Sequence, residues 1–338
     1  SDLRYLTGYD ALPLERLTCL IIVKDKPAVL LVPQLERPAA QVHGLDRFGI
    51  ELDSWTEVQD PIAILAGHTG TVASAAVIDT MWAQKALAIQ KTLGVPTVAA
   101  GNILSDLRAV KDDQELQAIS QAGAAIDSVH SNMNQWLKPC RTEREVARDI
   151  ADAIISSGHN RVDFVIVASG PNGASPHHEC SDRIINLGEP VVVDIGGTMP
   201  SGYCSDSTRM YICGQPSADY LEKYQVLQRA QQAAVTGVTA GMTGKQADDI
   251  ARDILTEHGL GEFFVHRTGH GLGLDTHEEP YLVGTNSKPL EIGNVFSIEP
   301  GFYVPGKYGA RIEDIVAITD AGIENFNNTT HDLVVLHG

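Results

Sequence analysis

The sequence predicts an α+β protein in which a smaller α/β domain precedes a larger domain. In the first hundred residues, short apolar runs alternate with helical stretches, as in a small α/β unit. A strong helical pattern begins at Asp113, after the polar segment 101–112. Beyond it, short β-rich runs are grouped around helices. A chain of 338 residues suits two domains, so we expect domains at residues 1–110 and 111–338.

The expected first domain has four apolar or helical segments. They lie at residues 19–23, 28–32, 61–65 and 72–93. The chain opens at Ser1 inside what reads as a structured element. We therefore expect the native first strand of this domain to be missing.

The expected second domain begins with two helices. Apolar residues recur at helical spacing from Leu116 to Trp136, and Pro139 ends the run. Thr142 and Glu145 form a capping-box pair at the start of the next helix, which is expected to end near residue 157. Later segments are predicted from the same patterns, with helices at 218–239 and 245–258 and strands at 163–168, 190–194, 208–213, 295–298 and 314–319.

Composition excludes several classes of partner. The net charge of −18 disfavours nucleic acid, which requires a basic surface. No run reaches the ~18 apolar residues of a membrane helix. The first ten residues lack the pattern of a signal peptide. Five cysteines without a C-x-x-C pair indicate reduced thiols. We therefore expect a cytoplasmic protein that contacts neither nucleic acid nor membrane.

Two aspartates are expected to lie side by side on a hairpin. Asp194 ends an apolar strand, and Asp206 begins the next strand twelve residues later. A turn with three glycines and a proline, within residues 196–202, is expected to join the strands. Close carboxylates repel each other, and a divalent cation would relieve the repulsion. Alternatively, each aspartate simply caps a turn.

Further residues of the same chemical type follow in denser motifs. His266, His270 and His277 fall within a glycine-rich stretch of twelve residues, and imidazole is the commonest nitrogen ligand of metals. Glu299 and Glu313 stand at strand edges fourteen residues apart. A glutamate after an apolar run needs a partner.

Together, these motifs offer four carboxylates and one imidazole, from Asp194, Asp206, His270, Glu299 and Glu313. Two divalent ions would balance the four negative charges. Oxygen-rich ligation without a thiolate favours Mn²⁺, and Co²⁺ or Zn²⁺ are alternatives. In an ordinary two-metal site the ions lie about 3.5–4 Å apart.

The motifs as a set resemble the pita-bread metallopeptidases, which include prolidase, aminopeptidase P and methionine aminopeptidase. The resemblance covers residues 113–338 and the junction segment 107–111. It implies a pita-bread, creatinase- and aminopeptidase-like catalytic domain behind a small creatinase-type N-terminal domain. It also implies a homodimer.

The resemblance implies a role for each ligand. Asp194 would bind one metal, and Asp206 and Glu313 would bridge both. His270 and Glu299 would complete the two coordination shells. Glu299 would also act as general base toward the bridging water.

Five further positions match family residues outside the ligand set. His177 matches the histidine that stabilises the intermediate or leaving group, and His277 matches the one that contacts the scissile carbonyl. The remaining three, His266, Tyr303 and Arg311, resemble substrate-binding or supporting positions.

Two departures from the family pattern bear on these assignments. The spacing between Asp194 and Asp206 is one residue longer than usual. His178 stands where a prolidase often has glycine, which leaves open whether His177 or His178 faces the site. His177 is favoured because it directly follows Pro176, as in the family motif.

Within the family, prolidase fits best, because about 110 residues precede the catalytic domain and Gly271 follows the ligand histidine. The predicted activity is hydrolysis of the bond before proline in dipeptides or short peptides. The alternatives are aminopeptidase P and a non-peptidase metal-dependent relative. Creatinase-like enzymes and chromatin-chaperone scaffolds with this fold lack the ligand set.

Overall fold

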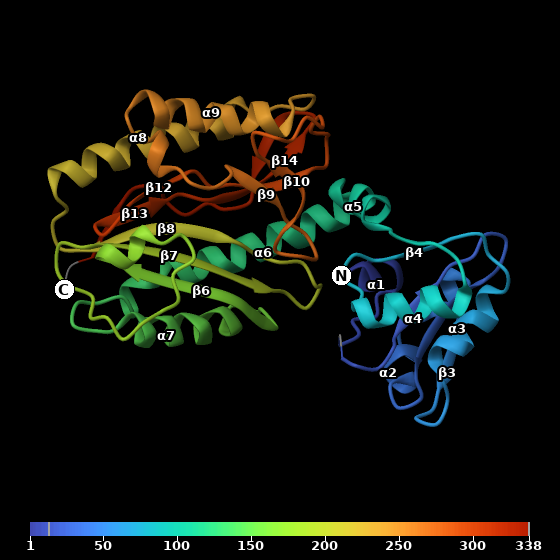
Figure 1. The fold of residues 1–338 in the computed structure, drawn as a ribbon. Helices are drawn as coiled ribbons and strands as arrows, with labels where there is room; N and C mark the ends of the chain where they lie inside the picture. The colour runs from blue at the N-terminus through green and yellow to red at the C-terminus, as the bar shows by residue number, and fades with distance from the viewer. Residues whose placement is uncertain (13, 337–338) are drawn as a thin grey trace. The chain divides into compact units, whose positions relative to one another are not determined.

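The computed structural model describes residues 1–12 and 14–336, and it divides into two compact units, Ser1–Leu107 and Arg108–Gly338. Figure 1 shows both units. Within the described ranges, no helix combines the length and the apolar character needed to cross a membrane.

The first unit is an α/β domain, as predicted. Its main sheet has the order β1 (Cys19–Ile21), β2 (Ala28–Pro33), β3 (Ile50–Trp55), and a separate parallel pair joins β4 (Ala75–Val77) and β5 (Thr97–Ala99). The strand β3 was not predicted, although Ile50-Glu51-Leu52-Asp53 alternates apolar and charged residues as in a half-buried strand. Its helices are α1 (Asp2–Thr7), α2 (Arg37–Gln41), α3 (Pro61–Thr69) and α4 (Ala83–Leu93). The helix α5 (Gly101–Ala109) begins in this unit and ends in the second.

The second unit is built on two sheets and a hairpin. The first sheet has the order β16 (Val334–Leu336), β8 (Ser207–Cys213), β7 (Pro190–Thr198), β6 (Arg161–Ser169). The second sheet has the order β10 (Glu278–Leu282), β9 (Gly269–Gly271), β11 (Val295–Ile298), β14 (Asp314–Thr319), β15 (Gly322–Asn325). The hairpin pairs β12 (Gly301–Val304) with β13 (Tyr308–Arg311). The α+β class predicted for this domain is confirmed.

Two helix pairs cover the strands of this unit on opposite sides (Figure 1). The pairs are α6 (Asp113–Ser131) with α7 (Glu143–Ser156), and α8 (Ala218–Gly237) with α9 (Gly244–Glu257). The predicted capping box of Thr142 and Glu145 is present at α7. The α6 helix ends before the predicted Trp136, and a short 3₁₀ turn at Met133–Gln135 continues its apolar spacing.

Strand alternation in β7 directs Asp194 toward one particular layer. Val191, Val193 and Ile195 belong to the apolar core that includes α6 and α7. Val192 belongs to the opposite core, which includes α8 and α9. Because successive side chains of a strand point to opposite faces, Asp194 shares the face of Val192.

The predicted turn between the two aspartates is shorter than expected. The strand β7 continues to Thr198, so Gly196 and Gly197 lie inside the strand. Close packing explains both glycines: a Cβ on Gly196 would lie 2.6 Å from the Phe164 ring, and one on Gly197 would lie 2.7 Å from a backbone oxygen. The turn itself is closed by a hydrogen bond of 2.9 Å between the amide of Met199 and the carbonyl of Tyr203.

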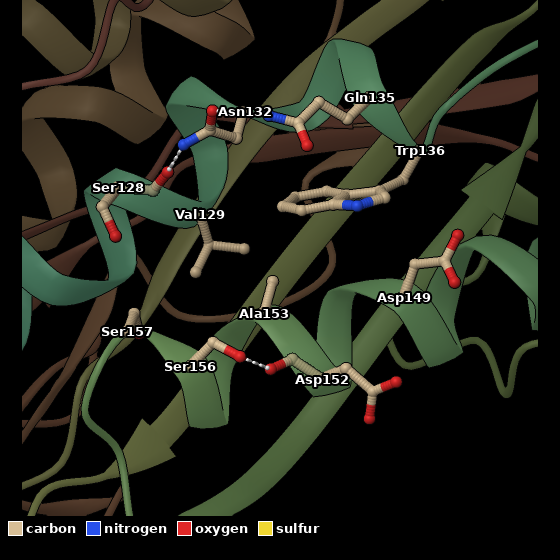
Figure 2. A pocket seen from close by; sticks show the side chains of 10 residues that line it. All are labelled: Ser128, Val129, Asn132, Gln135, Trp136, Asp149, Asp152, Ala153, Ser156 and Ser157. Carbon is tan, nitrogen blue, oxygen red and sulfur yellow. Dashed lines mark hydrogen bonds between the residues drawn. The ribbon is translucent and has the colours of Figure 1, made fainter.

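A groove of about 530 Å³ lies between the end of α6 and the α7 helix. Figure 2 shows its lining, in which Val129 and Trp136 are accompanied mainly by serines, amides and aspartates. None of the predicted site residues lines this groove, so it is separate from the site described next.

Candidate metal centre

Three buried side chains converge between the two sheets of the second unit. Asp206, His270 and Glu313 each offer a ligand atom, and these atoms lie within 4.8 Å of one another. Asp206 directly precedes β8, His270 lies on β9, and Glu313 directly precedes β14. An isolated bridge between Thr208 and Glu313 connects the sheets at this point.

Glu299 joins the cluster from the end of β11. Its Oε1 lies 3.2 Å from Nε2 of His270, and the same nitrogen lies 3.7 Å from Oδ2 of Asp206. The strand β11 pairs with both β9 and β14. Sheet pairing therefore brings Glu299 to residues that are distant in sequence.

Asp194 completes the group of five predicted ligands. Its Oδ2 pairs with Nη2 of Arg311. Its Oδ1 is buried and has no hydrogen-bond partner in the described chain. A buried carboxylate oxygen without a donor is costly, and a bound cation would satisfy it. The residues therefore fit the divalent metal that the donor set implies.

The pKa values of the cluster also favour a bound cation. Burial raises the pKa of Asp206 and of Glu313 well above their usual values, and the neighbouring carboxylates raise them further. Burial also raises the pKa of Glu299 to about 7. Four carboxylates cannot easily be ionised together in this dry cluster, and divalent cations would offset the repulsion.

The ring of His270 is oriented by a backbone hydrogen bond. Its Nδ1 lies 3.1 Å from the carbonyl oxygen of Gly271 and so donates to it. Burial lowers the pKa of His270 to about 3, so the ring is neutral. The lone pair is therefore on Nε2, the nitrogen that faces Asp206 and Glu299.

Two hydroxyl groups that the sequence analysis did not single out hold the glutamates. Thr208 Oγ1 donates to Oε2 of Glu313 at 2.6 Å, and Ser297 Oγ donates to Oε1 of Glu299 at 3.1 Å. The two-residue period of a strand was the available signal. It places Thr208 on the face of Asp206, and Ser297 on the face of Glu299.

Arg311, Tyr303 and His266 form one hydrogen-bonded chain behind Asp194. Nη1 of Arg311 donates to the Tyr303 hydroxyl at 2.6 Å, and this hydroxyl lies 2.9 Å from Nε2 of His266. Nδ1 of His266 lies 2.7 Å from the carbonyl oxygen of Arg267 and donates to it. Arg311 and Tyr303 are almost fully buried, so their contacts with protein groups mainly orient Asp194.

His277 lies beside the cluster. Its ring centroid is 3.9 Å from that of His270. Nη2 of Arg267 lies 3.3 Å from Nδ1 of His277. Burial lowers the pKa of His277, and the charges of Arg267 and His177 lower it further. Because arginine can only donate, Nδ1 accepts and the neutral ring carries its proton on Nε2.

The adjacent histidines 177 and 178 have different surroundings. Nε2 of His178 lies 2.8 Å from Oε2 of Glu143. Glu143 is fully buried and also accepts hydrogen bonds from Ser169, Asn172 and Ser181. His177 is exposed, and its charge contributes to lowering the pKa of His277. His178 therefore anchors the loop that carries His177.

Replacing Glu143 with glutamine should destabilise the protein by about 3 kcal/mol. The amide nitrogen of glutamine cannot accept the hydrogen bonds that the buried carboxylate takes from its neighbours. Burial would raise the pKa of Glu143, but hydrogen bonds from Ser181, Ser169 and His178 outweigh it and lower the pKa. The stabilising contribution is therefore fully present above the ordinary value of 4.5 and is lost as the pH falls through the folded-state pKa. Urea unfolding at pH 7 and at about pH 3.5 measures this: the gap to wild type should narrow at low pH, and a pH-independent gap would contradict it.

Family comparisons give this geometry a context. The model of metallopeptidase family M24 matches residues 117–320, and that of the creatinase/prolidase N-terminal domain matches residues 1–110. The chain belongs to metallopeptidase family M24. It is therefore a hydrolase of the metal-dependent peptidases, with the pita-bread catalytic fold that the resemblance implied.

Relatives of this M24 enzyme match it along nearly its whole length. The chain is 48% identical to "Probable dipeptidase PepE" of Mycobacterium tuberculosis, over 99% of this chain and 90% of that protein. The solved dipeptidase PepE of Mycobacterium ulcerans has a TM-score of 0.94 at 48% identity, covering 100% of this chain and 91% of that one. The prolidase of Thermococcus sibiricus has a TM-score of 0.92 at 37% identity, covering 99% and 92%.

Family membership establishes the enzyme class. The chain is a metallopeptidase, and its M24 relatives include proteins named dipeptidase and prolidase. The predicted enzyme class is confirmed.

Proposed function

We propose that this M24 enzyme is an Xaa-Pro dipeptidase that hydrolyses the bond before proline with two divalent ions. The observation that carries the proposal is the buried cluster of Asp206, His270 and Glu313, whose ligand atoms lie within 4.8 Å of one another. Glu299 reaches His270 at 3.2 Å, and the buried Oδ1 of Asp194 has no partner in the described chain. Two divalent ions would balance the four negative charges. The oxygen-rich donor set favours Mn²⁺, with Co²⁺ or Zn²⁺ as alternatives.

Asp194, Asp206, His270, Glu299 and Glu313 would hold the ions. Bound ions would supply Lewis acidity and lower the pKa of a water nucleophile. Glu299 is the proposed general base, since its carboxylate reaches the ligand cluster at His270. The Thr208 and Ser297 hydroxyls hold the two glutamates in these orientations.

Two histidines would act on the substrate. His277 carries its proton on Nε2, so it can donate to the oxygen of the scissile carbonyl as negative charge develops there. His177, on the loop anchored by His178 and Glu143, would assist the intermediate or the leaving group. His266, Tyr303 and Arg311 are proposed to bind substrate or to support the ligands beside it.

Proline specificity is supported by the relatives. Besides the prolidase, a solved Xaa-Pro dipeptidase of Bacillus anthracis has a TM-score of 0.92 at 29% identity, covering 99% of this chain and 92% of that one. The bond before proline is a tertiary amide without an N–H, so its cleavage requires a site that does not depend on that donor.

Substrate hydrolysis after chelation tests the proposal. The protein is stripped of metal, loaded with Mn²⁺, Co²⁺ or Zn²⁺, and assayed with Ala-Pro, Ala-Ala and Ala-Pro-Ala. We expect metal-restored cleavage of Ala-Pro above both other peptides. Equal or faster cleavage of Ala-Pro-Ala would indicate aminopeptidase P, and inactivity with every metal would indicate a non-peptidase relative.

We also propose a cytoplasmic homodimer. All five cysteines are free, which supports a reducing compartment. The homodimer follows from the family resemblance alone. Light scattering of the metal-loaded protein should give twice the 36.3 kDa chain mass, and a monomer mass would reject the homodimer.

A further inference from the structure

Charged side chains on both sides of His277 are paired with two cations. Nζ of Lys111 lies 2.7 Å from Oε1 of Glu278, the residue directly after His277. Arg108 pairs through Nη2 with Oε2 of Glu278, and the same nitrogen lies 2.7 Å from Oδ2 of Asp275. We call these four residues, Arg108, Lys111, Asp275 and Glu278, the charge clamp.

The central side chains of the charge clamp are buried. The side chains of Lys111, Glu278 and Arg108 are 1%, 9% and 10% exposed. Burial lowers the pKa of Lys111, and the charge of Glu278 opposes this shift. Buried ion pairs add little net stability, because desolvation offsets their attraction, but some of them fix one conformation. The charge clamp is therefore better suited to orienting a segment than to stabilising the fold.

Hydrogen bonds to its backbone hold the segment that carries Arg108 and Lys111. The backbone amide of Lys111 donates to the carbonyl of Gly293 at 2.8 Å. Nδ2 of Asn294 donates to the carbonyl of Ala109 at 3.0 Å. Gly293 and Asn294 directly precede β11, which leads to Glu299. The cationic half of the clamp is thus tied to the strand that supplies a proposed metal ligand.

Glu278, an anion of the charge clamp, lies close to both His270 and His277 along the chain and the sheet. Glu278 begins β10 and pairs with Gly271 of β9, next to His270. A Cβ on Gly273 would lie 2.5 Å from Oε1 of Glu278, so the loop between His270 and His277 folds closely over this carboxylate. Holding Glu278 therefore holds the backbone on both sides of His277.

We propose that Glu278, held by Lys111 and Arg108, is a positioning residue that sets the placement of His277 against the metal centre. This inference rests on the proposed role of His277 toward the scissile carbonyl. Glu278 does not touch the substrate, and its effect on turnover passes through His277.

A double-mutant cycle tests this. Four proteins are loaded with Mn²⁺ and assayed with Ala-Pro: wild type, Glu278→Gln, His277→Ala and the double variant. Their metal content is also measured. Glu278→Gln should lower kcat about tenfold, as supporting residues around metal sites do, with metal retained. In the His277→Ala background it should change kcat by less than about twofold, within the error of additivity.

The outcomes separate the two hypotheses. If Glu278→Gln lowers kcat equally in both backgrounds, Glu278 is not a positioning residue for His277, while the role of His277 itself stands. Full activity of His277→Ala would overturn that role, and positioning with it. If Glu278→Gln does not fold, Asp275→Asn, which removes the exposed arm of the clamp, should give a smaller loss that also disappears without His277. Asp249→Asn, in a surface pair with Lys245, is the matched control and should match wild type.

Discussion

Replacing Asp206 with alanine is expected to lower the rate of Ala-Pro hydrolysis about a thousandfold, because bound metal ions supply several kcal/mol of transition-state stabilisation. Asp206 lies within 4.8 Å of both His270 and Glu313 and is 4% exposed, so its loss removes a donor at the centre of the cluster. The fold should persist. Burial raises the pKa of Asp206, which means that ionised Asp206 does not stabilise the metal-free protein.

Thermal unfolding with and without Mn²⁺ separates these effects. Wild type should gain stability from the ion, because a ligand that binds only the folded state stabilises it. Asp206→Ala should unfold near the metal-free wild type and gain little from Mn²⁺. The surface variant Asp249→Asn should behave as wild type. Turnover of Asp206→Ala close to wild type would reject the dimetal proposal.

Replacing His277 with alanine is expected to lower kcat about a hundredfold and to leave the metal content unchanged. His277 is not among the five proposed ligands, although its ring lies 3.9 Å from that of His270. The loss would come from the Nε2 proton that Arg267 fixes through Nδ1. Elemental analysis beside steady-state kinetics measures both quantities, and a parallel loss of metal and turnover would assign His277 to the metal centre instead.

Elements whose own residues determine them were predicted well. The strands Val295–Ile298 and Asp314–Thr319 and the capping box of α7 match the prediction, because apolar runs and caps are local signals. The strands β9, β12 and β13 were missed. Each has three or four residues including glycine, and such strands form only when partner strands are present.

In the candidate site, too, residues in local motifs could be predicted and long-range contacts could not. The five predicted ligands stand inside recognisable local motifs, so they could be predicted from the sequence. The contact of Lys111 with Glu278 joins residues 167 positions apart, and nothing in either local sequence indicates the pairing. Thr208 was within reach of prediction through strand periodicity, whereas the assignment of His178 to Glu143 required the folded loop.

Titration of Mn²⁺ into the chelated enzyme, with Ala-Pro hydrolysis followed at each step, tests the two-metal proposal most directly. We expect calorimetry to give two ions per chain and activity to reach its plateau only as the second site fills. Full activity at one ion per chain, or turnover that survives complete chelation, would contradict the account.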